Sequence, residues 1–250
     1  MYSGVLICTP HRQVMGPVGP MLDTVTIHWM RARMKLQAPF GMDWTEFRVD
    51  GMLVADARNA ACQYALDNNF EFVFFLDDDV IVPTGALQQL ANKILNYPEV
   101  DVMSGVYCSK CDYATPLIYK DDVSHAHWQW TIGEMLIDGI KGFGMGCTLI
   151  RTSLLQRMAH SKDNPWFKTT EKVEVIDDKV INTNETEDFY FLTRARKECN
   201  SKLAVDTSIL CNHIDKKTGL IYKLPEDSLP FRRWRLQQDA KTMKDVAINT

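Results

Sequence analysis

The stretch that most constrains the fold of this 250-residue chain is 72–80, where five large apolar residues run directly into three aspartates. An apolar run of about five β-prone residues, bounded by charge, predicts a strand buried on both faces, as in a parallel sheet. The carboxylates of Asp77, Asp78 and Asp79 then lie at the carboxyl end of that strand, where open α/β sheets bind ligands. Because adjacent carboxylates repel one another, the cluster favours a hard cation such as Mg²⁺ or Mn²⁺.

The same three aspartates also fit a purely structural role. Acids that follow a strand can form a solvated turn or cap the next helix. One cap needs only one side chain, and Thr84 can serve as the cap of the helix that follows. The stretch by itself leaves both interpretations open.

The first 107 residues alternate between strand-like and helix-like patterns. Strands are expected at 5–8, 44–49, 72–76 and 100–107, and helices at 21–36, 54–68 and 84–96. This alternation predicts βαβ units and an α/β fold with a mostly parallel, doubly wound sheet. Short β-like pieces follow, so we expect one domain, 1–250, with parts at 1–107 and 108–214, a tail at 215–250 and a small additional β region.

Composition excludes several classes of protein. The net charge of -4 and pI near 5.9 lack the basic excess that is typical of nucleic-acid binding. No apolar run approaches the roughly 18 residues of a membrane span, and Val5 to Cys8 is strand-like rather than part of a signal peptide. Seven cysteines, an odd number, do not suggest a secreted disulfide framework. We therefore expect a soluble, cytoplasmic protein without an integral membrane segment or a nucleic-acid partner.

Three features of residues 108–146 have both a functional and a structural interpretation. Trp128 and Trp130, two residues apart on an expected strand, are either core or an exposed platform for a sugar ring. The spacing of Cys108 and Cys111 lacks the second pair that a structural zinc site needs. The glycines at 142, 144 and 146 permit close backbone approach to a ligand, or simply a bend. Their spacing is not that of a dinucleotide-binding loop.

Two later residues are candidates for chemistry. Asn184 and Glu187 fit a capping box, which leaves Asp188 in a first helical turn, where the dipole favours an ionised carboxylate. Such a group is either an ordinary surface acid or a general base. His213 follows a late strand and is either a structural histidine or a metal ligand.

The tail is basic in two places, at 216–217 and 231–235. Basic side chains after the last strand could clamp a diphosphate. The arginines and tryptophan of the second cluster could instead contact an anionic membrane surface, or lie on a solvated helix.

Together these features resemble the GT-A-fold glycosyltransferases, particularly family 2. Five segments carry the resemblance in the family's order: Ala57-Arg58-Asn59 is similar to its A-R-N segment, Asp77-Asp78-Asp79 to its D-x-D motif, Gly142 to Gly146 to its glycine loop, Glu187-Asp188 to its x-E-D motif, and His213 to its late metal-binding histidine. The resemblance covers about residues 3–214.

The resemblance implies metal-dependent, inverting transfer of a sugar from a nucleoside-diphosphate sugar to a hydroxyl of a glycan, protein or small molecule. It makes residues 1–107 the nucleotide-binding half and 108–214 the acceptor and catalytic half. The implied roles are general base for Asp188, Mn²⁺ or Mg²⁺ ligation for Asp79 and His213, and nucleotide-sugar contacts for Thr9, Arg58, Asp77, Asp78, Lys110, Gly144 and Lys216.

The sequence also departs from the family pattern. Three consecutive acids leave the D-x-D register open, and Asp50 is the nearest candidate for the acid expected after the second strand. Residues 231–235 lack the glutamine of a processive synthase. Two rival functions are a sugar nucleotidyltransferase, whose glycine- and lysine-rich loop is missing after Thr9, and a noncatalytic carbohydrate-binding protein that uses Trp128 and Trp130.

Overall fold

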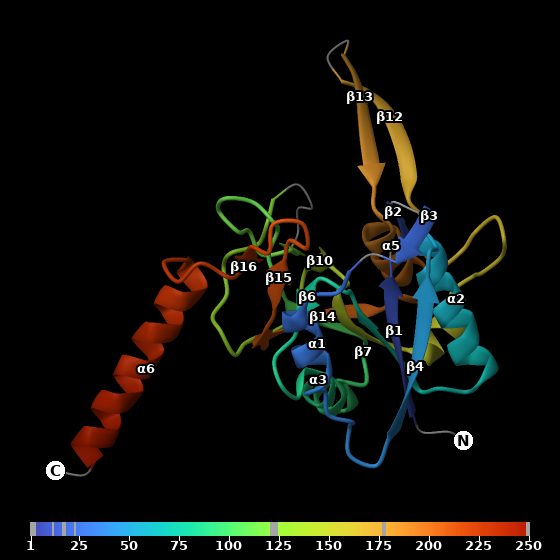
Figure 1. Cartoon of the computed structure of the whole chain (residues 1–250). Helices are drawn as coiled ribbons and strands as arrows, with labels where there is room; N and C mark the ends of the chain where they lie inside the picture. The colour runs from blue at the N-terminus through green and yellow to red at the C-terminus, as the bar shows by residue number, and fades with distance from the viewer. Residues whose placement is uncertain are drawn as a thin grey trace.

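A seven-stranded sheet forms the centre of the protein (Figure 1). The computed structural model describes residues 4–11, 13–16, 19–22, 24–120, 125–176 and 179–248. In spatial order the strands are β4 (Asp43–Asp50), β1 (Gly4–His11), β5 (Phe72–Leu76), β11 (Cys147–Arg151), β7 (Val100–Val106), β14 (Lys202–Leu210) and β9 (Met135–Leu136).

Most strands of this sheet run in one direction. β4, β1 and β5 pair in parallel, and so do β7 and β14. β11 lies antiparallel between β5 and β7, so these two neighbours share a direction, and β9 is antiparallel at the edge. The predicted mostly parallel α/β sheet is therefore confirmed, with β11 as an inserted antiparallel strand.

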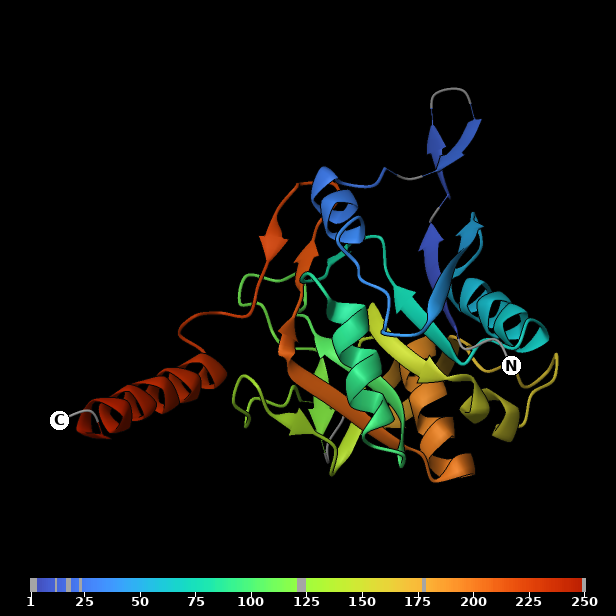
Figure 2. The same ribbon diagram turned by 90° about the horizontal axis from the view of Figure 1, so that it is seen from below.

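Helices cover both faces of the sheet, as Figure 2 shows from below. They are α1 (Ile27–Arg33), α2 (Val54–Asp67), α3 (Ala86–Leu95), α4 (Thr152–Arg157) and α5 (Glu187–Cys199), whereas the last helix, α6 (Leu229–Ile248), lies apart from the sheet. Val73 and Phe75 of β5 belong to one apolar cluster, with residues of α2, α4 and α5. Phe72, Phe74 and Leu76 belong to the other, with residues of α1 and α3. The predicted strand is thus buried on both faces, and the sheet is doubly wound.

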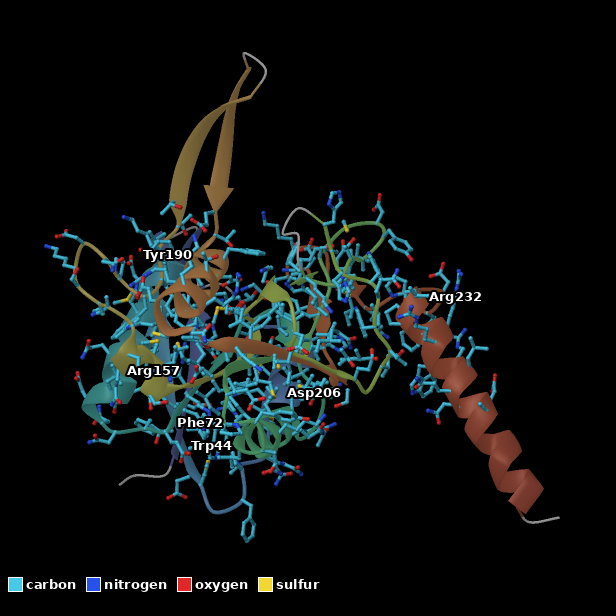
Figure 3. All side chains as sticks on the ribbon, turned by 180° about the vertical axis from the view of Figure 1, so that it is seen from behind. Trp44, Phe72, Arg157, Tyr190, Asp206 and Arg232 are labelled. Carbon is cyan, nitrogen blue, oxygen red and sulfur yellow. The ribbon has the colours of Figure 1, made fainter. Side chains whose placement is uncertain are left out.

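Small sheets and two projecting elements complete the fold. The sheets comprise β2 (Gln13–Gly16) with β3 (Gly19–Leu22), β8 (Ile118–Lys120) with β10 (Ile140–Phe143), β12 (Thr170–Ile176) with β13 (Lys179–Glu185), and β6 (Val80–Ile81) with β15 (Asn212–Ile214) and β16 (Ile221–Tyr222). The β12–β13 hairpin and α6 stand away from the body (Figure 1). Figure 3 shows Arg232 at the root of α6, well separated from Phe72.

The basic cluster at 231–235 lies on α6, in agreement with the helical interpretation of the tail. Among the described residues, every helix is too short or too polar to cross a bilayer.

The helix predicted at 21–36 is wrong at both ends. Residues 19–22 form β3, in which Met21 pairs with Val14, and α1 spans only Ile27–Arg33. The side chain of Thr26 accepts a hydrogen bond from the backbone N–H of Trp29 at 3.2 Å, which caps the helix at its start. The helical spacing of apolar residues continues on both sides of Thr26, so it did not reveal where the helix begins. It also could not detect the β2–β3 hairpin.

Two further local predictions are also wrong. The N-cap of α3 is Gly85 rather than Thr84, with a φ of 75° that suits glycine. Residues 128–132 form a loop instead of a strand. Within it Trp130 is 0% exposed, and its Nε1 donates to the carbonyl of His127 at 2.9 Å. Trp130 therefore belongs to the core and cannot form a sugar platform with Trp128.

The burial of β5 can be tested with Phe74→Ala. Phe74 is 0% exposed, and truncation of a buried phenylalanine typically costs about 3–5 kcal/mol of unfolding free energy. Urea unfolding followed by circular dichroism measures the change. Phe40→Ala, at a position that is 93% exposed, is the control and should stay within about 0.5 kcal/mol of the parent. Equal effects of the two substitutions would contradict the placement of β5 in the core.

Candidate active site

The three aspartates lie directly after β5, at the carboxyl edge of the sheet. The short strand β6 follows them and pairs antiparallel with β15, which places Val80 opposite His213. The backbone N–H of Ile214 also donates to the carbonyl oxygen of Asp79 at 2.9 Å. This pairing brings the late histidine to the acid cluster.

Arg58 of α2 joins acids from two parts of the chain. Its Nη2 donates to the carboxylate oxygens of Asp77 at 3.2 and 3.3 Å. Its Nη1 donates to Oε1 of Glu187 at 3.0 Å and to Oδ1 of Asp188. The ring centroid of Phe75 lies 5.4 Å from its Cζ. This side chain is 1% exposed and faces the acids, and the nucleotide contact that the family resemblance implied for Arg58 stays a prediction.

Asp188 lies in the first turn of α5, and its Oδ2 accepts from the backbone N–H of Met145 at 3.3 Å. Burial raises the pKa of its carboxyl group to about 7. The charge of Arg58 opposes this rise, while Glu187 and Asp77 add to it. A carboxyl group with a pKa near neutrality can gain and lose a proton under working conditions, as a general base must.

The capping box predicted at Asn184 and Glu187 is wrong. Asn184 lies in β13 opposite Glu171, and the N-cap of α5 is Thr186, whose side chain makes no capping hydrogen bond. Glu187 binds Arg58 instead. A buried guanidinium needs acceptors more than a helix end near solvent does, so the tertiary contact replaces the local one.

The two lysines predicted to bind diphosphate both reach the acid cluster. Nζ of Lys216 lies 3.0 Å from each carboxylate oxygen of Asp78, and Nδ1 of His11 lies 3.1 Å from one of them. Nζ of Lys110 lies 2.5 Å from Oδ2 of Asp79. Each acid is therefore neutralised by a cation that a diphosphate could also attract.

Asp79 and His213 face each other, with Oδ2 and Nε2 3.4 Å apart. Nδ1 of His213 lies 2.8 Å from the carbonyl oxygen of Cys108. Because a carbonyl only accepts hydrogen bonds, Nδ1 must carry a proton, and Nε2 is left facing the carboxylate. Burial opposes ionisation of Asp79, but His213 and Lys110 outweigh burial and lower its pKa to about 2.

These donors fit a cation only in part. Within the ranges that the structure describes, no three His, Cys, Asp or Glu side chains are arranged to hold a metal ion. Asp79 and His213 supply two donors, one ionised and one oriented by the Cys108 carbonyl. Mg²⁺ in proteins commonly takes one or two carboxylates and completes its shell with water and substrate phosphates. The pair thus suits a cation that binds together with a diphosphate.

Acidic and basic side chains line a cavity of about 650 Å³ at this edge. Its walls include Pro10, His11, Met52, Leu53, Val54, Asp77, Asp78, Asp79, Lys110, Asp215, Lys216 and Lys217. A neighbouring cavity of about 280 Å³ is lined by Thr9, Trp29 and Phe47 and shares His11 with the first. Thr9 therefore lies beside the acid-lined cavity, at the end of β1.

The glycines at 142–146 let the loop approach site residues closely. A Cβ at Gly144 would overlap the hydroxyl of Tyr107, and one at Gly146 would lie 2.9 Å from a carboxylate oxygen of Asp77. The carbonyl of Gly146 accepts from the backbone N–H of Asp77 at 3.0 Å. Close packing against Tyr107 accounts for Gly144, and close packing against Val80 and Asp77 accounts for Gly146. The nucleotide-sugar contact of Gly144 stays a prediction.

No pattern in the sequence singled out Tyr107 or His11, and Glu187 had only a structural role as a predicted helix cap. Tyr107 accepts a hydrogen bond from the backbone N–H of Gly146 at 3.0 Å, and burial raises its pKa well above the usual value. Tyr107 and His11 both lie at carboxyl ends of strands of the central sheet. The same edge rule that identified the aspartates could have found them.

Comparison with known proteins agrees with the predicted resemblance. Residues 51–162 match the family model described as "Glycosyl transferase family 2". This match, over 112 of the 250 residues, confirms the predicted resemblance to the family. This match supports a nucleotide-sugar glycosyltransferase in general terms.

Among solved structures, the crystal structure of A197 from STIV matches with a TM-score of 0.54 and 18% sequence identity. The alignment covers 90% of this chain and 96% of A197, which confirms the fold. UTP-bound UGPase from Acinetobacter baumannii aligns with a TM-score of 0.37 and 10% identity, over 66% of this chain and 53% of that one. A search of curated proteins finds no match.

The contact between Tyr107 and the glycine loop can be tested with Tyr107→Phe. Loss of the hydroxyl leaves the buried N–H of Gly146 without its acceptor, which should cost about 1–3 kcal/mol of unfolding free energy in a urea titration. Tyr113→Phe makes the same chemical change at a residue that is 53% exposed and should stay within about 0.5 kcal/mol of the parent. A Tyr107→Phe protein as stable as the parent would show that this hydrogen bond contributes little.

Proposed function

We propose that the protein transfers a sugar, with inversion, from a nucleoside-diphosphate sugar to an acceptor hydroxyl, with Asp188 as general base. The observation that carries the proposal is the acid-lined cavity, where three aspartates meet Lys110 and Lys216. Arg58 binds Asp188 and also binds Asp77, which lies in the wall of this cavity. The family match supports the donor class, and the geometry supports the individual roles.

In the proposed reaction, the bond between the anomeric carbon and the diphosphate oxygen breaks, and the diphosphate leaves with the electron pair. The acceptor oxygen forms the new bond to the anomeric carbon and gives its proton to the Asp188 carboxylate. Lys110 and Lys216 would neutralise charge on the diphosphate as it develops. Thr9, beside the second cavity, would contact the base of the nucleotide.

Asp79 and His213 would hold the divalent cation, Mn²⁺ or Mg²⁺. Such an ion supplies positive charge to the leaving diphosphate. Without it, the second ring nitrogen of His213 faces the Asp79 carboxylate and must either be protonated or direct a lone pair at it. Asp79 and His213 would offer such an ion one carboxylate and one ring nitrogen. Lys110, now bound to the same carboxylate oxygen, would then be free for the diphosphate.

The role of Asp188 can be tested with Asp188→Asn. The amide cannot accept the proton, so turnover should fall by about 10²- to 10⁴-fold while donor binding persists. Turnover is measured as release of nucleoside diphosphate, and binding by thermal shift. Asp239→Asn, an exposed acid on α6, is the control and should match the parent. Unchanged turnover in Asp188→Asn would remove Asp188 from the mechanism.

Donor and cation binding can be tested with a thermal-shift panel of UDP, GDP, CDP, TDP and ADP, each with and without Mn²⁺. A ligand at 100 times its dissociation constant adds about 2.7 kcal/mol, which should raise the melting temperature by several degrees. We expect one nucleotide to act, only with Mn²⁺, and the response to disappear in Asp79→Asn. Stabilisation by free saccharides alone would favour the carbohydrate-binding alternative, and a shift with a nucleoside triphosphate instead would favour a nucleotidyltransferase.

A further inference from the structure

Arg58 is the residue whose surroundings agree least with a role in nucleotide contact. Its side chain is 1% exposed, and both terminal nitrogens are bound to carboxylates. The neighbouring side chain is also held, because the Asn59 amide donates to the carbonyl oxygen of Phe167 at 2.8 Å and accepts from the backbone N–H of Phe167 at 2.9 Å. The guanidinium is therefore a fixed part of the interior.

The acids around Arg58 come from both sides of the proposed reaction centre. Asp77 lines the cavity proposed for the donor, and Asp188 is the proposed base. Arg58 binds both, with Nη2 on Asp77 and Nη1 on Asp188 and Glu187. A planar guanidinium holds its acceptors at fixed angles, which a flexible ammonium does not.

We propose that Arg58 is a positioning residue that fixes the carboxylate of Asp188 relative to the donor cavity and stabilises its ionised form, rather than a residue that contacts the nucleotide. This inference rests on the proposed function of Asp188. Arg58 touches no substrate in this role, and it acts through the carboxylate that it holds.

The charges that face Asp188 agree with this role. Arg58 on α2 is the cation in direct contact with it, while Glu187 on α5 and Asp77 after β5 both disfavour its ionised form. Burial adds to their effect, and Arg58 opposes it. Loss of the Arg58 charge should therefore make Asp188 harder to ionise, and loss of the Glu187 charge should make it easier.

Three variants distinguish the effect of the Arg58 charge on Asp188 from the effect of its planar geometry and from a contact with the nucleotide. Arg58→Gln removes the charge and should shift the acidic limb of the kcat profile upward by about one pH unit or more, a tenfold loss of kcat on that limb. Arg58→Lys keeps the charge and should largely restore the midpoint, with kcat still reduced because an ammonium lacks the planar fork. Glu187→Gln keeps Arg58 and should shift the midpoint downward. KM for the donor should stay unchanged in all three, and Arg232→Gln, exposed on α6, is the control.

The proton affinity of Asp188 is also measured without any activity, by titration of its ¹³C-labelled carboxyl signal in NMR, assigned through Asp188→Asn. We expect the same order of midpoints: highest in Arg58→Gln and lowest in Glu187→Gln. If Arg58→Gln does not fold, the parent, Arg58→Lys and Glu187→Gln still give this order. A raised donor KM with an unmoved Asp188 midpoint would overturn the proposal in favour of nucleotide contact. If the midpoints shift as expected but no variant, parent included, turns over a nucleotide sugar, the proposed function fails and the Arg58 contact stands.

Discussion

Arg58 loses nearly all contact with water, and the cost of burying its guanidinium is offset only because three carboxylates converge on it. The converse also holds, since three acids this close together would repel one another without a shared cation. Removal of one partner from a buried ion pair typically costs about 3–5 kcal/mol. The helix that carries Arg58, the end of β5 and the start of α5 are therefore tied together at the point where chemistry is proposed.

A second set of ion pairs lies beside this cluster, in the wall of the acid-lined cavity. Asp78 and Asp79 bind Lys216 and Lys110, and the pairing of β6 with β15 brings His213 to the same place. The two lysines are more exposed than Arg58. Each of them can therefore leave its aspartate and bind a ligand at a lower cost in free energy. The contacts of Arg58 thus hold the site together, whereas the contacts of Lys110 and Lys216 would be available to a diphosphate and its cation.

Much of the fold follows from patterns that a single sequence contains. The buried strand 72–76, the alternation of strands and helices before Tyr107 and the doubly wound sheet were all predicted correctly, because burial and periodicity are local signals. The hairpin before α1 was missed, because its two four-residue strands contain glycine and proline and show no alternating pattern that predicts a strand. The antiparallel insertion of β11 was also missed, because the direction of a strand within a sheet depends on how distant segments cross.

The sequence by itself determined the location of the candidate site, because acids at the carboxyl end of a buried strand can only emerge at one edge of the sheet. It also placed Asp188 in the first turn of a helix. Only the tertiary structure decided which charges meet: Arg58 binds Asp188, 130 residues away, and Asp78 binds Lys216, 138 residues away. Such pairs have no local signature. They depend on long-range packing, and for that reason a predicted helix cap at Glu187 became an ion pair, and no local pattern placed Arg58 at the centre of a buried cluster.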